Sequence, residues 1–347
     1  MLAAEFPHKT ADAALQVAYL RNLLRIPHYA PAISGQVLGL IVDRILQIDV
    51  CCSTSAPLTL QVDIQTELDE QDAAQSPAPS GSSADSASVD GAAAPVQDML
   101  AALDAMLAAL LGDLVPVFAQ AAPRSTADAV FGHLLGAFED VVLQTFRSRY
   151  TQFVVFWAAQ TDCAYTARFL RAVLGRALDA AQPHVARRAA CAYIASFVAR
   201  AASLSRDAVR RTVDALCTWT AQFLDEWQES EGGHPGVQTF YVVVQALLYI
   251  FCFRWRELAN DDPQDGAWLA SLGALQRATA SELAPVGRCS ATVVAQFGAT
   301  AERVGFVWGG AAGGTGVRVD AYFPFDPCRL AESRRFIDPV YREWEDT

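Results

Sequence analysis

The sequence predicts an all-α protein, a HEAT-like helical-repeat solenoid, and three observations lead to this prediction. Apolar residues recur at steps of three and four along most of the chain, which is the spacing of one helix face. Short polar or Gly- and Pro-containing breaks separate these segments. Between Val96 and Glu282 the helix pairs form units of about 40 residues, the period of HEAT and armadillo repeats. An ordinary helical bundle would show the same periodicity, but the short, serial helices favour the solenoid.

Each helix is predicted from its apolar stripe and its end signals. The stripe that begins at Val96 continues to Leu114 with only isolated acidic residues between its members. Asp162 and Ser205 are placed as N-caps, and Pro183 stands at a first-turn position. The expected elements are helices at 11–25, 32–49, 96–114, 125–146, 152–160, 163–181, 183–202, 206–229, 236–258 and 266–282, with strands only at 58–64 and 316–321.

Composition divides the chain into four regions. They are helical repeats at 1–50, an acidic Ser/Ala/Pro-rich insert at 51–95, HEAT-like repeats at 96–300, and a C-terminal segment at 301–347 that docks on the solenoid. The net charge of −12 is concentrated around the insert. Since the insert has too little apolar surface to offset the entropy of ordering, we expect it to be disordered. Ser76, which precedes Pro77, is a candidate phosphorylation site, and a passive linker serine explains it equally well.

No pattern typical of catalysis, cofactor binding or metal binding stands out. The eight cysteines are scattered, without a Cys-x-x-Cys pair, which argues against a zinc site and favours a reducing compartment. The glycine-rich stretch 309–316 lacks the lysine of a phosphate-binding loop, and the histidines have no metalloprotease spacing. The apolar run 237–253 contains two glutamines and is short for a membrane span, so we expect a buried helix. We predict neither an enzyme nor a membrane protein.

A basic stretch raises the question of nucleic-acid binding. Arg187, Arg188 and Arg200 are a candidate basic patch, but Arg200 lies about 18 Å along the helix from Arg188 and about 120° around it. In the next helix, Asp207 can pair with Arg211, and Arg210 with Asp214, at i,i+4 spacing. Helix faces that neutralise themselves are favoured over a dedicated DNA site.

The C-terminal segment carries too many large apolar groups to remain in water. We therefore expect it to dock on the last repeats, either as a lid over the end of the helix stack or as a surface for a partner. Prolines limit its helix content. Pro339 is predicted to open a short final helix through Trp344, with Asp338 as its N-cap.

The same segment resembles the C-terminal signature of the RNA polymerase I-specific transcription initiation factors. The resemblance rests on Phe323-Pro-Phe325-Asp326-Pro-Cys328, on Ser333-Arg334-Arg335-Phe336-Ile-Asp338-Pro339, and on Trp344-Glu-Asp346. Three further blocks agree, from Tyr19 to Val50, from Arg187 to Ala201, and from Phe240 to Arg254. The order is kept over 19–347. Family members carry helical repeats ahead of this region, so the resemblance implies that the chain begins within the solenoid.

The resemblance implies a protein adaptor without chemistry of its own. It would bridge RNA polymerase I, near the stalk, and promoter-bound core factors at ribosomal DNA, in the nucleus and nucleolus. Ala202 replaces a basic residue of the family, which weakens any direct contact with promoter DNA; a homodimer is compatible with the sequence. A generic HEAT-repeat scaffold for transport or assembly is the alternative. The candidate partner-facing or signature residues are Phe323, Phe325, Asp326, Arg334, Arg335, Phe336, Asp338 and Trp344.

Overall fold

The computed structural model describes residues 5–55, 90–119, 123–145, 148–229, 235–260, 268–309, 318–319, 322–326, 328 and 330–344. The chain forms two compact units. The first comprises Met1–Ala137, Thr145–Thr151 and Leu330–Arg334, and the second Phe138–Gln144, Gln152–Arg329 and Arg335–Thr347. Ser76, the strand expected at 58–64 and most of the acidic insert lie outside the described residues.

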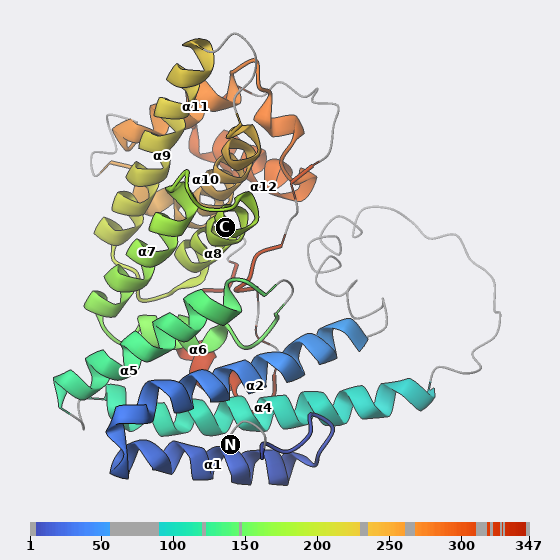
Figure 1. Ribbon diagram of the computed structural model, residues 1–347. Coiled ribbons are helices and arrows are strands. Elements are labelled where there is room, and N and C mark those ends of the chain that lie inside the picture. The colour runs from blue at the N-terminus through green and yellow to red at the C-terminus, as the bar shows by residue number, and fades with distance from the viewer. Residues whose placement is uncertain are drawn as a thin grey trace. The chain divides into compact units, whose positions relative to one another are not determined.

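The first unit is a group of helices, drawn from blue through cyan to green in Figure 1. α1 packs on α4 and α2, and α2 also packs on α5. Their apolar stripes form the core, in which Leu20, Ile41, Leu103 and Phe131 are fully buried. Two helices extend into the range expected for the insert. The helices of this unit are α1 (Ala13–Tyr29), α2 (Ser34–Ser55), α4 (Asp90–Phe118) and α5 (Arg124–Ala137).

The helix expected at 125–146 is divided in the structure. α5 ends at Ala137, and Phe138–Val142 continue as a π-helical turn that is closed by a hydrogen bond from the Leu143 N–H to the Phe138 carbonyl oxygen at 2.8 Å. The wider turn changes the helix phase, and Phe138 and Val142 are both buried. The apolar periodicity alone could not distinguish this turn from a continuous helix.

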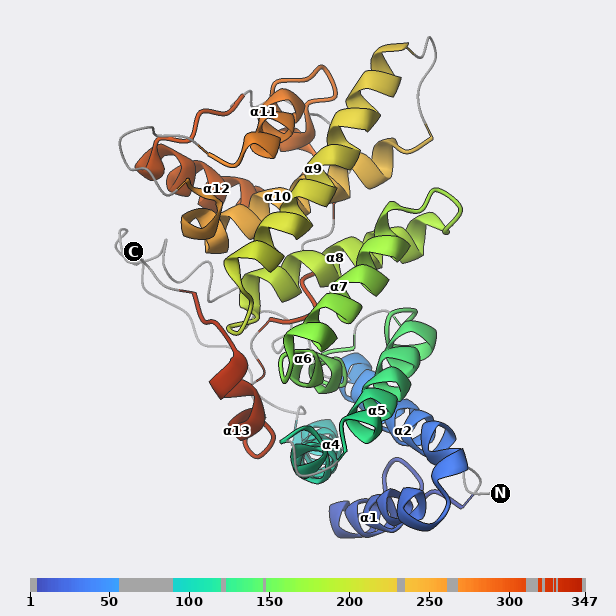
Figure 2. The same cartoon turned by 90° about the vertical axis from the view of Figure 1, so that its left-hand side faces the viewer.

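The second unit is a serial stack of helices, seen from green to orange in Figure 2. α8 is the central helix. It packs against α7 and α10, and from Ala190 onward it is buried on nearly all sides, as its apolar composition predicts. The helices are α6 (Phe153–Ala159), α7 (Cys163–Leu178), α8 (His184–Arg200), α9 (Arg206–Glu229), α10 (Val237–Leu258), α11 (Gly273–Thr279), α12 (Ala291–Val304) and α13 (Arg334–Ile337), of which only Arg334 belongs to the first unit.

Helix ends largely follow the sequence signals. The Asp162 carboxylate accepts a hydrogen bond from the Ala164 N–H (2.7 Å), and the Ser205 hydroxyl accepts one from the Ala208 N–H (3.2 Å), which confirms both predicted caps. Pro183 precedes its helix as the N-cap. The segment expected as one helix at 266–282 contains only a 3-10 turn and the short α11 in its described part.

The all-α, helical-repeat fold class is confirmed. The described residues form helices and turns, with only isolated bridges of extended backbone, between Ala201 and Tyr341 and between Ala259 and Trp268. Two described helices, Val96–Phe118 and Val237–Leu258, are long and apolar enough to cross a membrane. The most apolar window of the second is 83% buried, as predicted for a core helix, and that of the first is 50% buried.

Candidate functional site: the C-terminal segment on the second unit

The first part of the C-terminal segment, residues 322–326, is anchored by the Phe325 ring. Phe325 is fully buried among the aromatic side chains of α6, α7 and α8. Its N–H donates to the hydroxyl of Ser196 (2.8 Å), and the amide of Gln152 donates to the Pro324 carbonyl oxygen (2.7 Å). The Tyr341 hydroxyl donates to the Phe325 carbonyl oxygen (3.0 Å). Both apolar contact and hydrogen bonding therefore fix this stretch. Phe325 packs against α6, α7 and α8, and not against the last repeats, where the segment was expected to dock.

Two further aromatic residues of the segment lie against α10. The Phe323 ring stacks on Tyr249, with centroids 3.8 Å apart and planes 11° apart. Trp344 meets Phe253 edge to face at 4.6 Å, but Trp344 keeps part of its surface exposed. The pair Tyr249 and Phe253 lies one helical turn apart on α10, so one helix face receives both ends of the segment.

Asp326 forms an ion pair with Arg200 at the C-terminal end of α8. The Arg200 guanidinium lies 3.7 Å from the Asp326 carboxylate, over the ring of Phe253 (4.5 Å) and near that of Tyr341 (5.4 Å). Burial raises the pKa of Asp326 to about 6, although Arg200 and a hydrogen bond from Tyr249 oppose the rise. Since 27% of the Asp326 side chain reaches solvent, its burial is incomplete. The two residues of this pair lie far apart in sequence, and the pair attaches the segment to α8.

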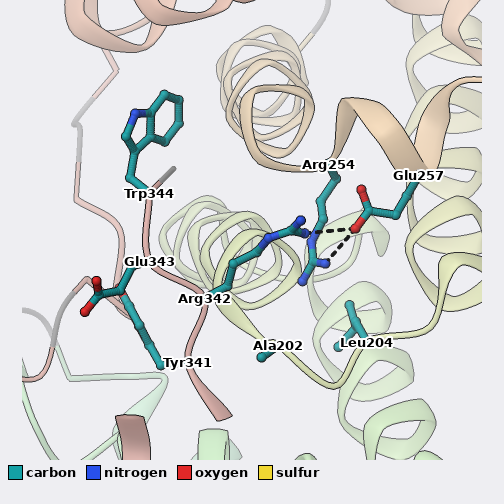
Figure 3. A pocket seen from close by; sticks show the side chains of 8 residues that line it. All are labelled: Ala202, Leu204, Arg254, Glu257, Tyr341, Arg342, Glu343 and Trp344. Carbon is teal, nitrogen blue, oxygen red and sulfur yellow. Dashed lines mark hydrogen bonds and ion pairs between the residues drawn. The ribbon is translucent and has the colours of Figure 1, made fainter. Parts of the chain in front are cut away.

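A second ion cluster holds the last residues of the segment, as Figure 3 shows. Arg254 and Arg342 both donate to the same carboxylate oxygen of Glu257, at 2.9 and 2.8 Å. Backbone contacts accompany it: the Arg342 N–H donates to the Arg200 carbonyl oxygen (2.6 Å), and the Ala202 N–H to the Val340 carbonyl oxygen (3.0 Å). A pocket of about 580 Å³ opens beside the cluster. Its lining is Ala202, Leu204, Arg254, Glu257, Tyr341, Arg342, Glu343 and Trp344.

The charge of Glu257 is expected to make this cluster sensitive to acid. Burial acts to raise the pKa of Glu257, but the hydrogen bonds from Arg342 and Arg254 outweigh it, so the pKa lies below its usual 4.5. The ionised carboxylate therefore stabilises the folded state at pH values above 4.5. This stabilisation is lost as the pH falls through the lowered pKa. At neutral pH we expect the free energy of unfolding of Glu257→Gln to be about 1–3 kcal/mol lower than that of wild type.

This difference should shrink under acidic conditions, because a protonated glutamate resembles glutamine. Thermal unfolding midpoints of both proteins at neutral pH and well below 4.5 measure it. Glu343→Gln is the control, since Glu343 is exposed and points away from the cluster. A gap between wild type and Glu257→Gln that stays constant on acidification would show that the Glu257 charge does not stabilise the segment.

The structure does not bring Arg187, Arg188 and Arg200 together on one surface. Arg187 is buried, and its Nε donates to the Ala177 carbonyl oxygen (3.0 Å). Arg200 is 9% exposed and faces Asp326. Of the three, Arg188 alone is exposed. Arg187 and Arg200 therefore stabilise the second unit through buried contacts and do not form an exposed basic patch with Arg188.

The ion pair expected between Arg210 and Asp214 is absent from this described part of α9. Instead, Arg210 donates to the carbonyl oxygens of Glu257 (2.8 Å) and Ala259 (2.6 Å). Asp214 accepts a hydrogen bond from the Ser271 hydroxyl (2.5 Å). Arg210 thereby satisfies carbonyl groups at the C-terminal end of α10, where a positive charge is also favoured by the helix dipole.

The remaining signature residues lie in and after α13. Arg334 and Arg335 are exposed, Phe336 is half-buried with the Arg335 guanidinium 4.9 Å from its ring centre, and Asp338 is exposed. The final helix expected from Pro339 through Trp344 is wrong. Instead, α13 ends at Ile337, a 3-10 turn covers Asp338–Val340, and the chain is extended from Tyr341, where its backbone pairs with the end of α8.

One anchoring residue of the first unit was not predicted. The carboxylate of Asp104, on the apolar helix α4, is buried and accepts the N–H groups of Glu332 (2.7 Å) and Ser333 (2.8 Å). An acidic residue within an apolar stripe is the only signal in the sequence, and it does not identify the partner.

Within the described residues no group of three or more His, Cys, Asp or Glu side chains could hold a metal ion.

Comparison with known proteins relates the chain to one family over nearly its whole length. The model of the family described as RNA polymerase I specific transcription initiation factor RRN3 matches residues 1–309 and 311–347. The chain is 31% identical over 384 residues to "RNA polymerase I-specific transcription initiation factor rrn3" of Schizosaccharomyces pombe, covering 98% of this chain and 62% of that protein. It is 27% identical over 380 residues to the Mus musculus factor of the same description, covering 100% and 58%.

A solved structure shares the fold. A crystal structure of the RNA polymerase I transcription initiation factor Rrn3 aligns with a TM-score of 0.77 at 23% identity, covering 99% of this chain and 68% of that one. The chain spans about three fifths of the length of the yeast and mouse relatives. The family is one of initiation factors and not of enzymes. On the match of its family model, the chain belongs to the RRN3 family of RNA polymerase I-specific transcription initiation factors.

Proposed function

We propose that this chain acts in transcription initiation as an adaptor that recruits RNA polymerase I to promoter-bound core factors at ribosomal DNA. The single observation that carries the proposal is the family match across 1–309 and 311–347. Serial helices expose long ridged surfaces, and such surfaces suit an adaptor that contacts two partners at once. The proposed partners are the polymerase near its stalk and the promoter core factor complex.

The proposal includes where the chain acts in the cell and whether it forms a dimer. A factor for ribosomal RNA synthesis would act in the nucleus and within the nucleolus, and homodimerisation is part of the proposal to be tested by gel filtration. Contact with promoter DNA would be weak or indirect, because Arg187 and Arg200 are buried and Ala202 carries no charge.

Capture from a nuclear extract tests the main proposal. The immobilised chain should retain RNA polymerase I subunits, and the purified chain should support or compete with promoter-dependent initiation in a reconstituted ribosomal DNA assay. Retention of transport receptors without polymerase I would contradict it and would favour a general helical-repeat scaffold.

Arg334 and Arg335 are the exposed cations of the family signature, so we expect them to face a partner. Arg334→Ala combined with Arg335→Ala should reduce polymerase capture several-fold and change the unfolding free energy by less than about 0.5 kcal/mol, as is usual at exposed sites. Arg188→Ala, an exposed arginine outside the signature, is the matched control. Undiminished capture by the double variant would exclude these two side chains from the interface.

A further inference from the structure

A second hollow in the second unit lies apart from the C-terminal segment. It has a volume of about 740 Å³, within the range of sites that hold ligands, and lies between α7 and the first turns of α9. Figure 2 shows these two helices, in green and yellow-green. One end is closed by Gln160, whose side-chain oxygen accepts the N–H (3.2 Å) and hydroxyl (3.1 Å) of Ser203. We call this hollow the α7–α9 groove.

The α7 wall of the α7–α9 groove carries an apolar stripe with small residues, whereas the opposite wall, with Ser203, Ser205, Arg211 and Thr212, is mostly polar. Ala167, Leu170, Leu174 and Leu178 line it from α7 at steps of three and four, so they form one stripe along the helix. This stripe is distinct from the one that packs against α8 through Phe169 and Val173, which are fully buried. Leu170 is also buried, so Ala167, Leu174 and Leu178 provide the exposed surface of the stripe. The small residues let another backbone approach α7 closely.

The charges of the α7–α9 groove have a definite order. Arg171 and Arg211 line it, both exposed, and neither forms an ion pair with another described residue. Asp162 and Asp179 lie at the two ends of α7, where their carboxylates accept N–H groups of Ala164 (2.7 Å) and of the chain just beyond the helix. The groove is therefore positive in its middle, at Arg171 and Arg211, and negative at its two ends.

From this arrangement we propose that the α7–α9 groove binds an amphipathic helix of a partner protein whose apolar stripe is flanked by acidic residues. The apolar stripe of α7 would receive the apolar face of that helix, as in other helix-in-groove interfaces. Arg171 and Arg211 would pair with the acidic flank. From Asp162 to Asp179 the groove side of α7 extends about 25 Å, long enough for four to five turns of a helix. The groove and the Arg334/Arg335 signature use different residues, so this binding does not depend on the proposed polymerase contact.

Gly175 offers a variant that fills the α7–α9 groove without disturbing the fold. It lines the groove, and a β-carbon added to it meets no atom within 4 Å. Leucine also has a higher helix propensity than glycine, so Gly175→Leu should fold at least as well as wild type. Gly39→Leu is the matched control, because Gly39 also lies inside a helix, α2, with open space at its β-carbon position.

The probes are three fluorescein-labelled helical peptides, measured by fluorescence anisotropy with the full chain. The first has a leucine stripe flanked by glutamates, the second has lysines in place of the glutamates, and the third has glutamines in place of the leucines. We expect the acidic peptide to bind wild type and Gly39→Leu equally, and Gly175→Leu at least ten-fold more weakly. The basic and the leucine-free peptides should also bind wild type at least ten-fold more weakly than the acidic one.

Reversing the charge of the two groove arginines gives an independent test of the proposal. Arg171→Glu combined with Arg211→Glu should weaken the acidic peptide and strengthen the basic one. The proposal is overturned if wild type binds the acidic and basic peptides equally, or if Gly175→Leu binds the acidic peptide as wild type does. It is also overturned if the wild-type chain forms a dimer that Gly175→Leu abolishes, since the occupant would then be a second copy of the chain. The Cys163 thiol, exposed in the groove, should be protected from alkylation by the acidic peptide alone.

Discussion

Phe325→Ala is expected to lower the free energy of unfolding by about 3–5 kcal/mol, the usual cost of truncating a buried phenylalanine. The ring is fully buried, and the chain around it is held by hydrogen bonds from both directions. Truncation would leave a cavity that the stiff aromatic cluster cannot close, and it would remove tilted and edge-to-face ring contacts. The rings lie at centroid distances from 4.7 to 6.5 Å and belong to Phe153, Phe156, Phe169, Tyr193 and Phe197.

Chemical denaturation followed by tryptophan fluorescence measures this loss. Trp344→Ala should cost less, because Trp344 remains partly exposed, whereas Phe325 is fully buried. Val185→Ala, at a side chain that is 77% exposed, should change the free energy by less than about 0.5 kcal/mol. If Phe325→Ala unfolds at the same denaturant concentration as Val185→Ala, the docking of the C-terminal segment is refuted.

Local periodicity predicted most of the fold because each helix buries one of its own stripes. The apolar stripes of α7, α9 and α10 predicted the ends of those helices to within a few residues. α12 was missed, although Val293, Phe297 and Ala301 recur at a step of four and are buried. The small residues between them, and the change of composition that follows, concealed the stripe.

The site was predictable where it depends on apolar burial and not where it depends on partners distant in sequence. The number of aromatic residues predicted that Phe325 would dock. The burial of Arg200 could not be foreseen, because its partner Asp326 and the rings around it come from other parts of the chain. From sequence alone, an arginine on a helix surface and an arginine in a buried ion pair look the same.

The structure divides the C-terminal signature into two groups with different roles. Phe323, Phe325 and Asp326 are held against α8 and α10, so they stabilise the second unit. Arg334 and Arg335, by contrast, are exposed. The interpretation of the segment as a lid on the repeats therefore suits Phe323, Phe325 and Asp326, whereas the partner-facing role proposed above concerns Arg334 and Arg335.

Arg254→Met is expected to cost about 3–5 kcal/mol, because it breaks a buried ion pair and leaves buried carbonyl groups without donors. Arg254 is 2% exposed and interrupts the helical backbone of α10. Its Nε donates to the Val198 carbonyl oxygen (2.7 Å), its Nη2 to that of Ala201, and its Nη1 to Glu257 (2.9 Å). One guanidinium thus satisfies the open C-terminal end of α8 and orients the carboxylate that holds Arg342.

Methionine keeps the length and apolar character of the arginine stem, so the loss would report the guanidinium and not a cavity. Arg254→Lys should recover only part of the stability, since a single ammonium cannot reproduce the fork of donors. Arg256→Met, at an exposed arginine on the same helix, is the control and should change the free energy by less than about 1 kcal/mol. Equal losses for Arg254→Met and Arg256→Met would mean that the guanidinium of Arg254 does not stabilise the contact between α8 and α10.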